Sequence, residues 1–180
     1  MVLLKPNPSA SIVPLQTEHA ERMFQWMCDP IVSANIGLRQ SPSLEKTRAW
    51  IANAIADASI RAFAIHAAEQ HVGNVVLDVI DPYLGSARLS IYIGESAFRH
   101  KHVGASAAYL AAKEGFEREN LNKIWLTAHV RNQAAITTYH NLGFVIEGIL
   151  REEFWLNGSR VDVFRMSLLR REFAEIKLDS

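Results

Sequence analysis

A short basic segment ahead of a helix of small residues is the part of this sequence best suited to phosphate chemistry. Residues 99–102 read Arg-His-Lys-His, and they follow an apolar run, residues 89–93, that has strand character. From Gly104 on, closely spaced alanines predict a helix that packs tightly on a sheet. The first N–H groups of a helix have no partner within it, and the helix dipole places partial positive charge there. Strand, basic loop and helix N-terminus together indicate a phosphate-binding site.

A second segment, residues 131–144, has the boundaries of a short helix and carries one tyrosine. Asn132 stands where a helix N-cap belongs, and Gly143 stands where a C-terminal cap belongs. Tyr139 shares a helical face with Ala135, which is typical of a core tyrosine. Its phenol can also donate a proton, so the spacing alone leaves a structural and a chemical role open.

The elements that must position these residues follow from the apolar patterning and the turn signals. The expected strands are residues 11–16, 61–67, 71–80, 87–93, 123–130, 145–155 and 160–169, and the expected helices are residues 17–27, 43–58, 104–120 and 132–142. Residues 31–42 are expected to be a loop, and Asn157-Gly158 predicts a hairpin turn. In the second helix the expected inward residues are Trp50, Ile51, Ala54 and Ile55. This order predicts an α+β fold around a mostly antiparallel sheet, with residues 1–180 forming a single domain.

Composition narrows the class of protein. The chain has 180 residues, of which 49% are hydrophobic and 21% charged, as is ordinary for a globular domain. Its formal net charge of zero argues against a nucleic-acid-binding module, although residues 99–102 form a local basic patch. No apolar run reaches about 18 residues, so no membrane span is expected, and the apolar N-terminus is too brief for a signal peptide. The lone Cys28 is expected to be a small buried hydrophobe in a reducing, cytoplasmic setting.

The two segments also carry a resemblance to a known family. The pattern that begins at Arg99 and reaches Gly104-Ala105, followed by Asn132-x-x-Ala-x-x-x-Tyr139-x-x-x-Gly-Phe, resembles the GNAT superfamily of N-acetyltransferases. It is most similar to the RimJ/RimL-like branch, which contains ribosomal-protein-alanine and spermidine acetyltransferases. The resemblance spans roughly residues 12–169. His100 and His102 stand where members of the family usually have glycine.

The resemblance implies a fold and a co-substrate. In the GNAT fold, the strands at 87–93 and 123–130 are parallel neighbours that splay apart, about four helices flank the sheet, and the thioester of acetyl-CoA lies in the gap. No metal is implied. The residues expected to bind acetyl-CoA are Ile91 and Ile93 along the pantetheine arm, Arg99, His100, Lys101, His102, Val103, Gly104 and Ala105 at the pyrophosphate, and Asn132 and Tyr139 near the arm and the thiol. Tyr139 occupies the position of the catalytic acid, which protonates the leaving thiolate.

The general base remains open in the sequence. Relatives in this branch often carry glutamate early in the strand before the pyrophosphate loop, where this chain has Arg88. The substitutes considered are Asp78, His129, Glu152 and Glu153, and water suffices if the amine has a low pKa.

The acceptor is expected to be a primary amine of a small molecule or of a protein N-terminus. Spermidine acetyltransferases carry acidic residues between the first two helices, whereas this chain has Arg39 there, which is the expected substrate-binding residue. A cation favours an acceptor that also carries negative charge. The alternatives are a nucleotide-linked amino-sugar acetyltransferase and a degenerate domain that binds CoA without turnover. A homodimer is compatible with each of these readings.

Overall fold

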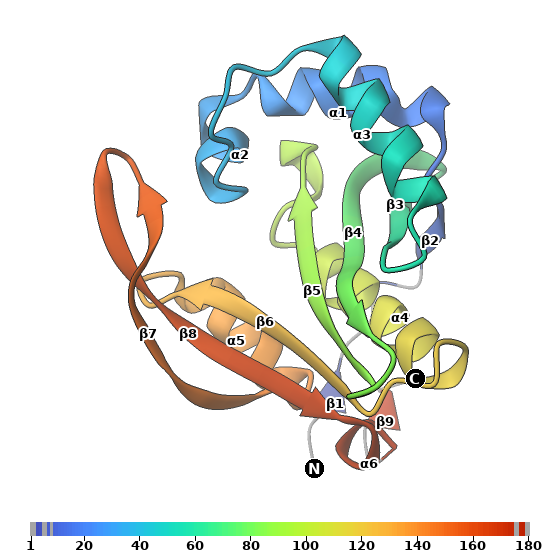
Figure 1. Ribbon diagram of the computed structural model, residues 1–180, viewed down its shortest axis with the longest axis vertical. Helices are drawn as coiled ribbons and strands as arrows, with labels where there is room; N and C mark the ends of the chain where they lie inside the picture. Colours follow the sequence, from blue (N-terminus) through green and yellow to red (C-terminus); the bar gives the residue numbers. More distant parts are fainter. Residues whose placement is uncertain (1–2, 5–6, 8, 175–176, 179–180) are drawn as a thin grey trace.

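A seven-stranded mixed sheet forms the centre of the computed structural model, which describes residues 3–4, 7, 9–174 and 177–178 (Figure 1). In sheet order the strands are β2 (Ala10–Pro14), β3 (Arg61–Ala67), β4 (Gln70–Asp81), β5 (Ser86–Ile93), β6 (Lys123–His129), β8 (Ser159–Leu169) and β7 (Val145–Leu156). All neighbours are antiparallel except β5 and β6, which are parallel. The predicted α+β architecture is therefore confirmed. Most of residues 1–6, the apolar segment that is too brief for a signal peptide, lie outside the described residues.

The helices cover the two faces of the sheet differently. They are α1 (Ala20–Met27), α2 (Pro30–Asn35), α3 (Leu44–Ala56), α4 (Val103–Glu117), α5 (Gln133–Asn141) and the short α6 (Arg170–Phe173). The alanines of α4 pack on Leu77, Leu89 and Ile124, in the larger core cluster. A second cluster packs α1 and α3 on the opposite face of the sheet through Met23, Trp26 and Ile51. A small parallel pair, β1 (Leu3–Leu4) and β9 (Lys177–Leu178), brings the two ends of the chain together. None of the described helices is long and apolar enough to cross a membrane.

The parallel pair separates soon after it forms. β5 and β6 are paired only at Ser86 with Lys123, Ala87 with Ile124, and Arg88 with Trp125. Beyond these pairs the two strands diverge, and Figure 1 shows the opening between them. The predicted splay of residues 87–93 and 123–130 is therefore confirmed. The edge of β5 from Leu89 onward has no partner on β6 in the part of the chain that the structure describes.

The prediction for residues 31–42 is wrong for a reason that lies in a helix boundary. Residues 31–42 were expected to be a loop, yet α2 occupies Pro30–Asn35. Asp29 is its N-cap and accepts a hydrogen bond from the Ile31 N–H at 2.8 Å, while Pro30 takes the first helical position. The Asp-Pro pair ends one helix and also begins the next, because proline suits the first turn.

Three apolar side chains lie further out than the sequence predicts. In α3, Ile51 and Ala54 face inward, but Trp50 and Ile55 are 42% and 59% exposed. One row of apolar side chains is enough to pack α3 in place, because only one side of this helix meets the sheet and α1. Cys28 is exposed rather than buried, because it follows the last residue of α1.

Three histidines gather at one end of the sheet, beside Trp26. The ring centroids of His19 and His71 lie 4.7 Å apart, and those of His66 and His71 lie 5.8 Å apart. His71 also forms a hydrogen bond to Asn74 at 3.0 Å. Burial lowers the pKa of His71 to about 4, and burial also lowers the pKa of His19. The imidazoles of His19 and His71 are therefore neutral at pH 7.

This cluster predicts that acid destabilises the protein. Between pH 6.5 and about 4 an unfolded chain binds a proton at His71 that the folded chain excludes, so the free energy of unfolding falls as the pH falls. The slope is at most about 1.4 kcal/mol per pH unit for each proton. In His71→Gln the loss of stability between pH 7 and 4.5, measured by urea unfolding, should be smaller. Substitution of the exposed His140 should leave the loss unchanged, and an equal loss in His71→Gln would contradict the assignment.

Candidate active site

The basic loop at the start of α4 keeps a backbone shape that normally belongs to glycine. His100 and His102 have φ values of 60° and 59°, whereas Lys101 between them does not have a positive φ. This left-handed conformation costs roughly 1–2 kcal/mol for a residue with a Cβ, although histidine tolerates it better than most. Alternating signs of φ turn successive N–H groups toward one concave side, which makes a site for anions. The loop therefore retains a phosphate-binding form without its glycines.

The α4 N-terminus completes this anion site. No side chain caps the helix among the described residues, and its N-cap is His102 itself. The side chains of Val103 and Ala105 are buried, so these residues can offer only their backbone N–H groups. His100, Lys101 and His102 instead have exposed side chains with polar groups that can contact a bound phosphate, and Lys101 also supplies a positive charge. Because the backbone keeps this shape with histidine at both positions, the two side chains can add contacts to a ligand without displacing the loop.

Arg99 has a different position from its neighbours. Its guanidinium donates hydrogen bonds to the carbonyl oxygens of Ile93, at 3.2 Å, and Gly94, at 3.0 Å. It also lies 3.6 Å from a carboxylate oxygen of Asp29, the N-cap of α2. These contacts turn the side chain toward the protein. Arg99 thus links the loop to the end of β5 and to α2, rather than extending freely toward a phosphate.

The end of β5 is held against α1. A Cβ on Gly94 would lie 2.0 Å from the Trp26 indole, so only glycine allows the strand to approach this ring. Next to it, Glu95 forms an ion pair with Arg22 of α1 at 2.8 Å. These contacts hold the end of β5 on the α1 side, away from β6. They explain why the parallel pair opens after three residue pairs.

The opened edge of β5 suits an extended, amide-rich ligand. Ile91 and Ile93 lie in the unpaired part of this edge and pair on the other side with Val75 and Gly73 of β4. Free N–H and C=O groups on a strand edge can bond an added strand-like chain. The pantetheine arm of CoA has amides of this kind, so the residues present fit it. Among the described residues, no cluster of His, Cys, Asp or Glu is arranged to hold a metal ion.

Asn132 and Tyr139 sit on α5. Asn132 is the N-cap, and its side-chain oxygen accepts a hydrogen bond from the Ala135 N–H at 3.1 Å, as the sequence predicts. The Tyr139 ring packs near Phe144, with centroids 5.8 Å apart. Burial raises the pKa of Tyr139 to about 12, so its phenol keeps its proton at neutral pH. The structure thus supports a cap role for Asn132 and a protonated phenol at Tyr139.

The candidate bases differ in whether other residues already engage their side chains. The Asp78 carboxylate is bound by the Arg88 guanidinium through two bonds of 2.7 Å and 2.6 Å, which occupy both of its oxygens. Glu152 and Glu153 are exposed on β7. The ring of His129, at the end of β6, lies tilted against the Phe154 ring, with centroids 4.3 Å apart and an interplanar angle of 54°. Burial lowers its pKa, which keeps the imidazole neutral and able to accept a proton at pH 7.

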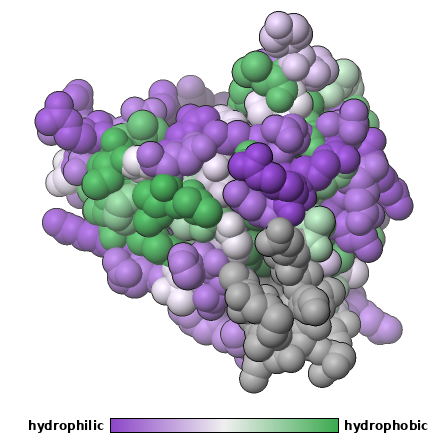
Figure 2. Space-filling model, turned by 90° about the horizontal axis from the view of Figure 1, so that it is seen from below, coloured by the Kyte–Doolittle hydropathy of each residue, from purple (hydrophilic) through white to green (hydrophobic). Residues whose placement is uncertain are grey.

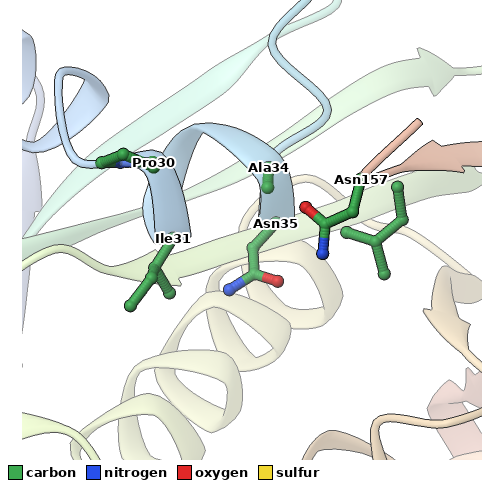
Figure 3. Close-up of a pocket in the computed structure, with 6 residues that line it drawn as sticks. Pro30, Ile31, Ala34, Asn35 and Asn157 are labelled. Carbon is green, nitrogen blue, oxygen red and sulfur yellow. The ribbon is translucent and has the colours of Figure 1, made fainter.

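A small cavity of about 270 Å³ lies between α2 and the turn that joins β7 and β8 (Figure 3). Its lining is apolar with two amides and consists of Pro30, Ile31, Ala34, Asn35, Leu156 and Asn157. Phe154 closes this region against Gly37, where a Cβ would lie 2.8 Å from its ring. Arg39 is exposed and does not line the cavity. The sequence missed these lining residues because it did not predict α2, whose signal was Asp29-Pro30.

Comparisons with known proteins agree with this geometry. Residues 11–145 match the acetyltransferase (GNAT) domain family. A spermidine N(1)-acetyltransferase of Escherichia coli K12 is 33% identical over 66% of this chain and 63% of its own length. One from Vibrio cholerae is 35% identical over 66% of this chain and 69% of its own length. The crystal structure of the Vibrio cholerae spermidine N-acetyltransferase with CoA and spermine superposes with a TM-score of 0.88 at 26% identity, over 94% of this chain and 100% of that chain.

The fold and the site therefore define a class of protein. The chain belongs to the GNAT acetyltransferase domain family, and its sheet with the opened parallel pair is the GNAT fold. YdaF of Bacillus subtilis, which is named a putative ribosomal N-acetyltransferase, is 28% identical over 56% of this chain and 55% of its own length, which agrees with the RimJ/RimL-like branch.

The anion site predicts a specific effect of a Cβ at Gly104. In Gly104→Ala the added carbon would lie 3.7 Å from Ile93, an ordinary contact, so the protein should fold normally. The same carbon would crowd a phosphate bound at the loop, with a cost of about 1–3 kcal/mol and a rise in the Kd of acetyl-CoA of about tenfold or more. Calorimetry measures this Kd. Gly148→Ala, at an open position on β7, is the matched control, and an unchanged Kd in Gly104→Ala would reject the site.

Removal of the Tyr139 hydroxyl should slow turnover and spare binding. Tyr139→Phe keeps the ring that packs near Phe144 and removes only the proton donor. Loss of a general acid lowers kcat by on the order of 10²-fold or more, while the Kd of acetyl-CoA should change little. Steady-state kinetics and calorimetry on the same preparation separate the two effects. Full activity in the variant, with chemistry shown to be rate-limiting, would remove Tyr139 from the mechanism.

Proposed function

We propose that this protein transfers the acetyl group of acetyl-CoA directly to a primary amine of a small molecule. The observation that carries the proposal is the concave, glycine-like loop before α4 beside the opened edge of β5. The loop suits a pyrophosphate and the strand edge suits pantetheine. Two relatives named as spermidine N-acetyltransferases, one of them solved with CoA, support this reading.

We also infer that residues 1–180 act as one domain, because the sheet runs from Ala10 to Leu169.

The residues of the opened site account for the steps of the transfer. Acetyl-CoA supplies a thioester, whose C–S bond breaks as the amine forms the new C–N bond. A backbone N–H on the free edge of β5 can stabilise negative charge on the acyl oxygen. Tyr139 gives its proton to the leaving thiolate, and His129 takes the proton that the amine loses. A kcat/KM profile of His129→Gln that kept the acidic limb of the native profile would remove His129 from this role.

The chemistry of the acceptor cavity distinguishes this chain from an enzyme for polycations. None of the six residues that line the cavity is acidic. The neighbouring Asp29 is engaged by the first turn of α2 and by Arg99, so its charge is already matched. Residues 30–43 contain no Asp or Glu and include Arg39. We therefore propose an acceptor amine whose remaining part is neutral or negatively charged, an amino sugar linked to a nucleotide being one such class.

Acetylation of a polyamine is the second candidate. It is favoured by the names of the relatives from Escherichia coli and Vibrio cholerae. The charge of the cavity opposes it, because a polyamine site needs carboxylates that face the amines. A degenerate CoA-binding domain without turnover is a further alternative, which the protonated Tyr139 and the neutral His129 disfavour.

We also infer that copies of the chain associate. A Vibrio cholerae relative with a TM-score of 0.81 forms a dodecamer. In this chain β7 is an edge strand of the sheet and exposes Val145, Ile146, Ile149 and Trp155. Seen from below, the molecule also presents a hydrophobic area on one side (Figure 2). A homodimer is the smallest assembly that covers such a surface, and a monomer at all concentrations in sedimentation would contradict it.

An acceptor screen tests the function and the charge argument together. The panel contains amino sugars, their nucleotide-linked forms, amino acids, peptide N-termini and spermidine. We expect acetyl-CoA-dependent turnover with a neutral or anionic amine and a poor kcat/KM for spermidine. Arg39 does not line the cavity, so it can bond only an anionic group that projects beyond it, and Arg39→Ala should raise the KM of such an acceptor by at most about tenfold. Arg171→Ala, an exposed arginine on α6, is the control.

Two outcomes of this screen would contradict the proposal. If spermidine were the best substrate, the argument from charge would be wrong, although the acetyl transfer itself would stand. Absence of turnover with every amine, together with tight binding of acetyl-CoA, would favour the degenerate CoA-binding domain.

A further inference from the structure

The loop that forms the anion site is held from outside by the N-terminal segment. The Asn7 side-chain amide donates a hydrogen bond to the Lys101 carbonyl oxygen at 3.0 Å. The Asn7 backbone N–H donates to the hydroxyl of Ser106 at 2.7 Å, and Ser106 is a buried residue of α4. Asn7 therefore bridges the loop and the first turns of α4. These two partners lie on either side of the N-terminal N–H groups of the helix.

The position of the Lys101 carbonyl gives this contact its importance. Lys101 lies between His100 and His102, the two residues with positive φ. Glycine adopts a positive φ without steric cost, whereas histidine has a lower energy at negative φ. A bond to the carbonyl between the two strained residues resists that change. The hydrogen bond thus acts at the point where this chain departs from the usual glycines.

The orientation of the Asn7 amide is fixed by a second set of contacts. Its oxygen accepts hydrogen bonds from the Ser9 N–H at 3.0 Å and the Ser9 hydroxyl at 2.7 Å. The nitrogen of the amide must then face the Lys101 carbonyl, so the assignment of the two ends follows from the hydrogen bonds. Asn7 also lies before residue 11, where the match to the acetyltransferase domain family begins.

We propose that Asn7 is a positioning residue that holds the loop at residues 99–103 in its anion-binding shape. The inference rests on the proposed function, because it concerns the same acetyl-CoA site. Asn7 acts through Lys101 and Ser106 and affects the part of the ligand that carries the pyrophosphate. The proposed path of the pantetheine arm and the thioester follows β5, to which Asn7 makes no hydrogen bond among the described residues.

The experiment compares a ligand that carries the pyrophosphate with one that lacks it. Acetyl-CoA carries the pyrophosphate, and acetyl-pantetheine carries the same thioester without it. In Asn7→Ala the ratio of kcat/KM for acetyl-CoA to kcat/KM for acetyl-pantetheine should fall about tenfold, and the Kd of CoA should rise by a similar factor. Ser11→Ala, an exposed serine on β2, is the matched control. Asn7→Leu keeps about the size of the side chain and removes the donor without adding charge, so it serves as the second variant if Asn7→Ala folds poorly.

Each outcome decides the inference. A ratio that falls in the Asn7 variants but not in Ser11→Ala supports it. An unchanged ratio overturns it, even if thermal stability is lower, because a purely structural role would reduce both activities alike. If the wild-type chain turns over acetyl-CoA and the ratio does not change, Asn7 alone is misassigned. If the wild-type chain neither binds nor uses acetyl-CoA, the proposed function fails as well.

Discussion

The packing of the Trp26 indole on Gly94 is the contact on which the rest of the site depends. It requires a residue without a side chain at the end of β5, and it draws that strand toward α1. The Arg22–Glu95 ion pair and the hydrogen bonds of Arg99 to Ile93 and Gly94 hold the same stretch. The end of β6 pairs instead with β8, His129 with Val163, so the two parallel strands separate. The opening between them, the free edge of β5 and the approach of an acceptor all follow from this separation.

The same contacts connect the two halves of the proposed reaction. Arg99 leaves the phosphate-binding loop, bonds the end of β5 and approaches Asp29, which begins α2. α2 in turn lines the cavity opposite Asn157, where we propose that the acceptor binds (Figures 1 and 3). Arg99 thus joins the loop, the end of β5 and the start of α2 through one guanidinium. Because that guanidinium also matches the charge of Asp29, the cavity lacks the free negative charge that a polycation would need.

The strained backbone of the loop before α4 is supported by hydrogen bonds from nearby side chains. Two histidines adopt a backbone conformation that favours glycine, and the structure keeps them there through bonds made by Asn7 and Arg99 on either side. Lys101 adds a positive charge, and the two exposed imidazoles add polar groups, that glycines would not supply. The proposed anion site therefore differs from a glycine loop in the side chains that surround it. Backbone strain at a binding site is typical where the surrounding structure determines the conformation.

The sequence by itself determined the order of the strands and helices, the hairpin at Asn157-Gly158, the cap at Asn132 and the loop that meets α4, because these features depend on local patterns. It did not reveal α2, since Asp29-Pro30 reads equally as the end of one helix and the start of another. Only the tertiary structure showed that Arg88 occupies Asp78, that Arg99 turns inward and that His129 lies beside Phe154. It also decided that Asn7 reaches Lys101 and that Gly94 lies under Trp26. These contacts join residues far apart in the chain, and the packing of whole elements determines which side chains meet.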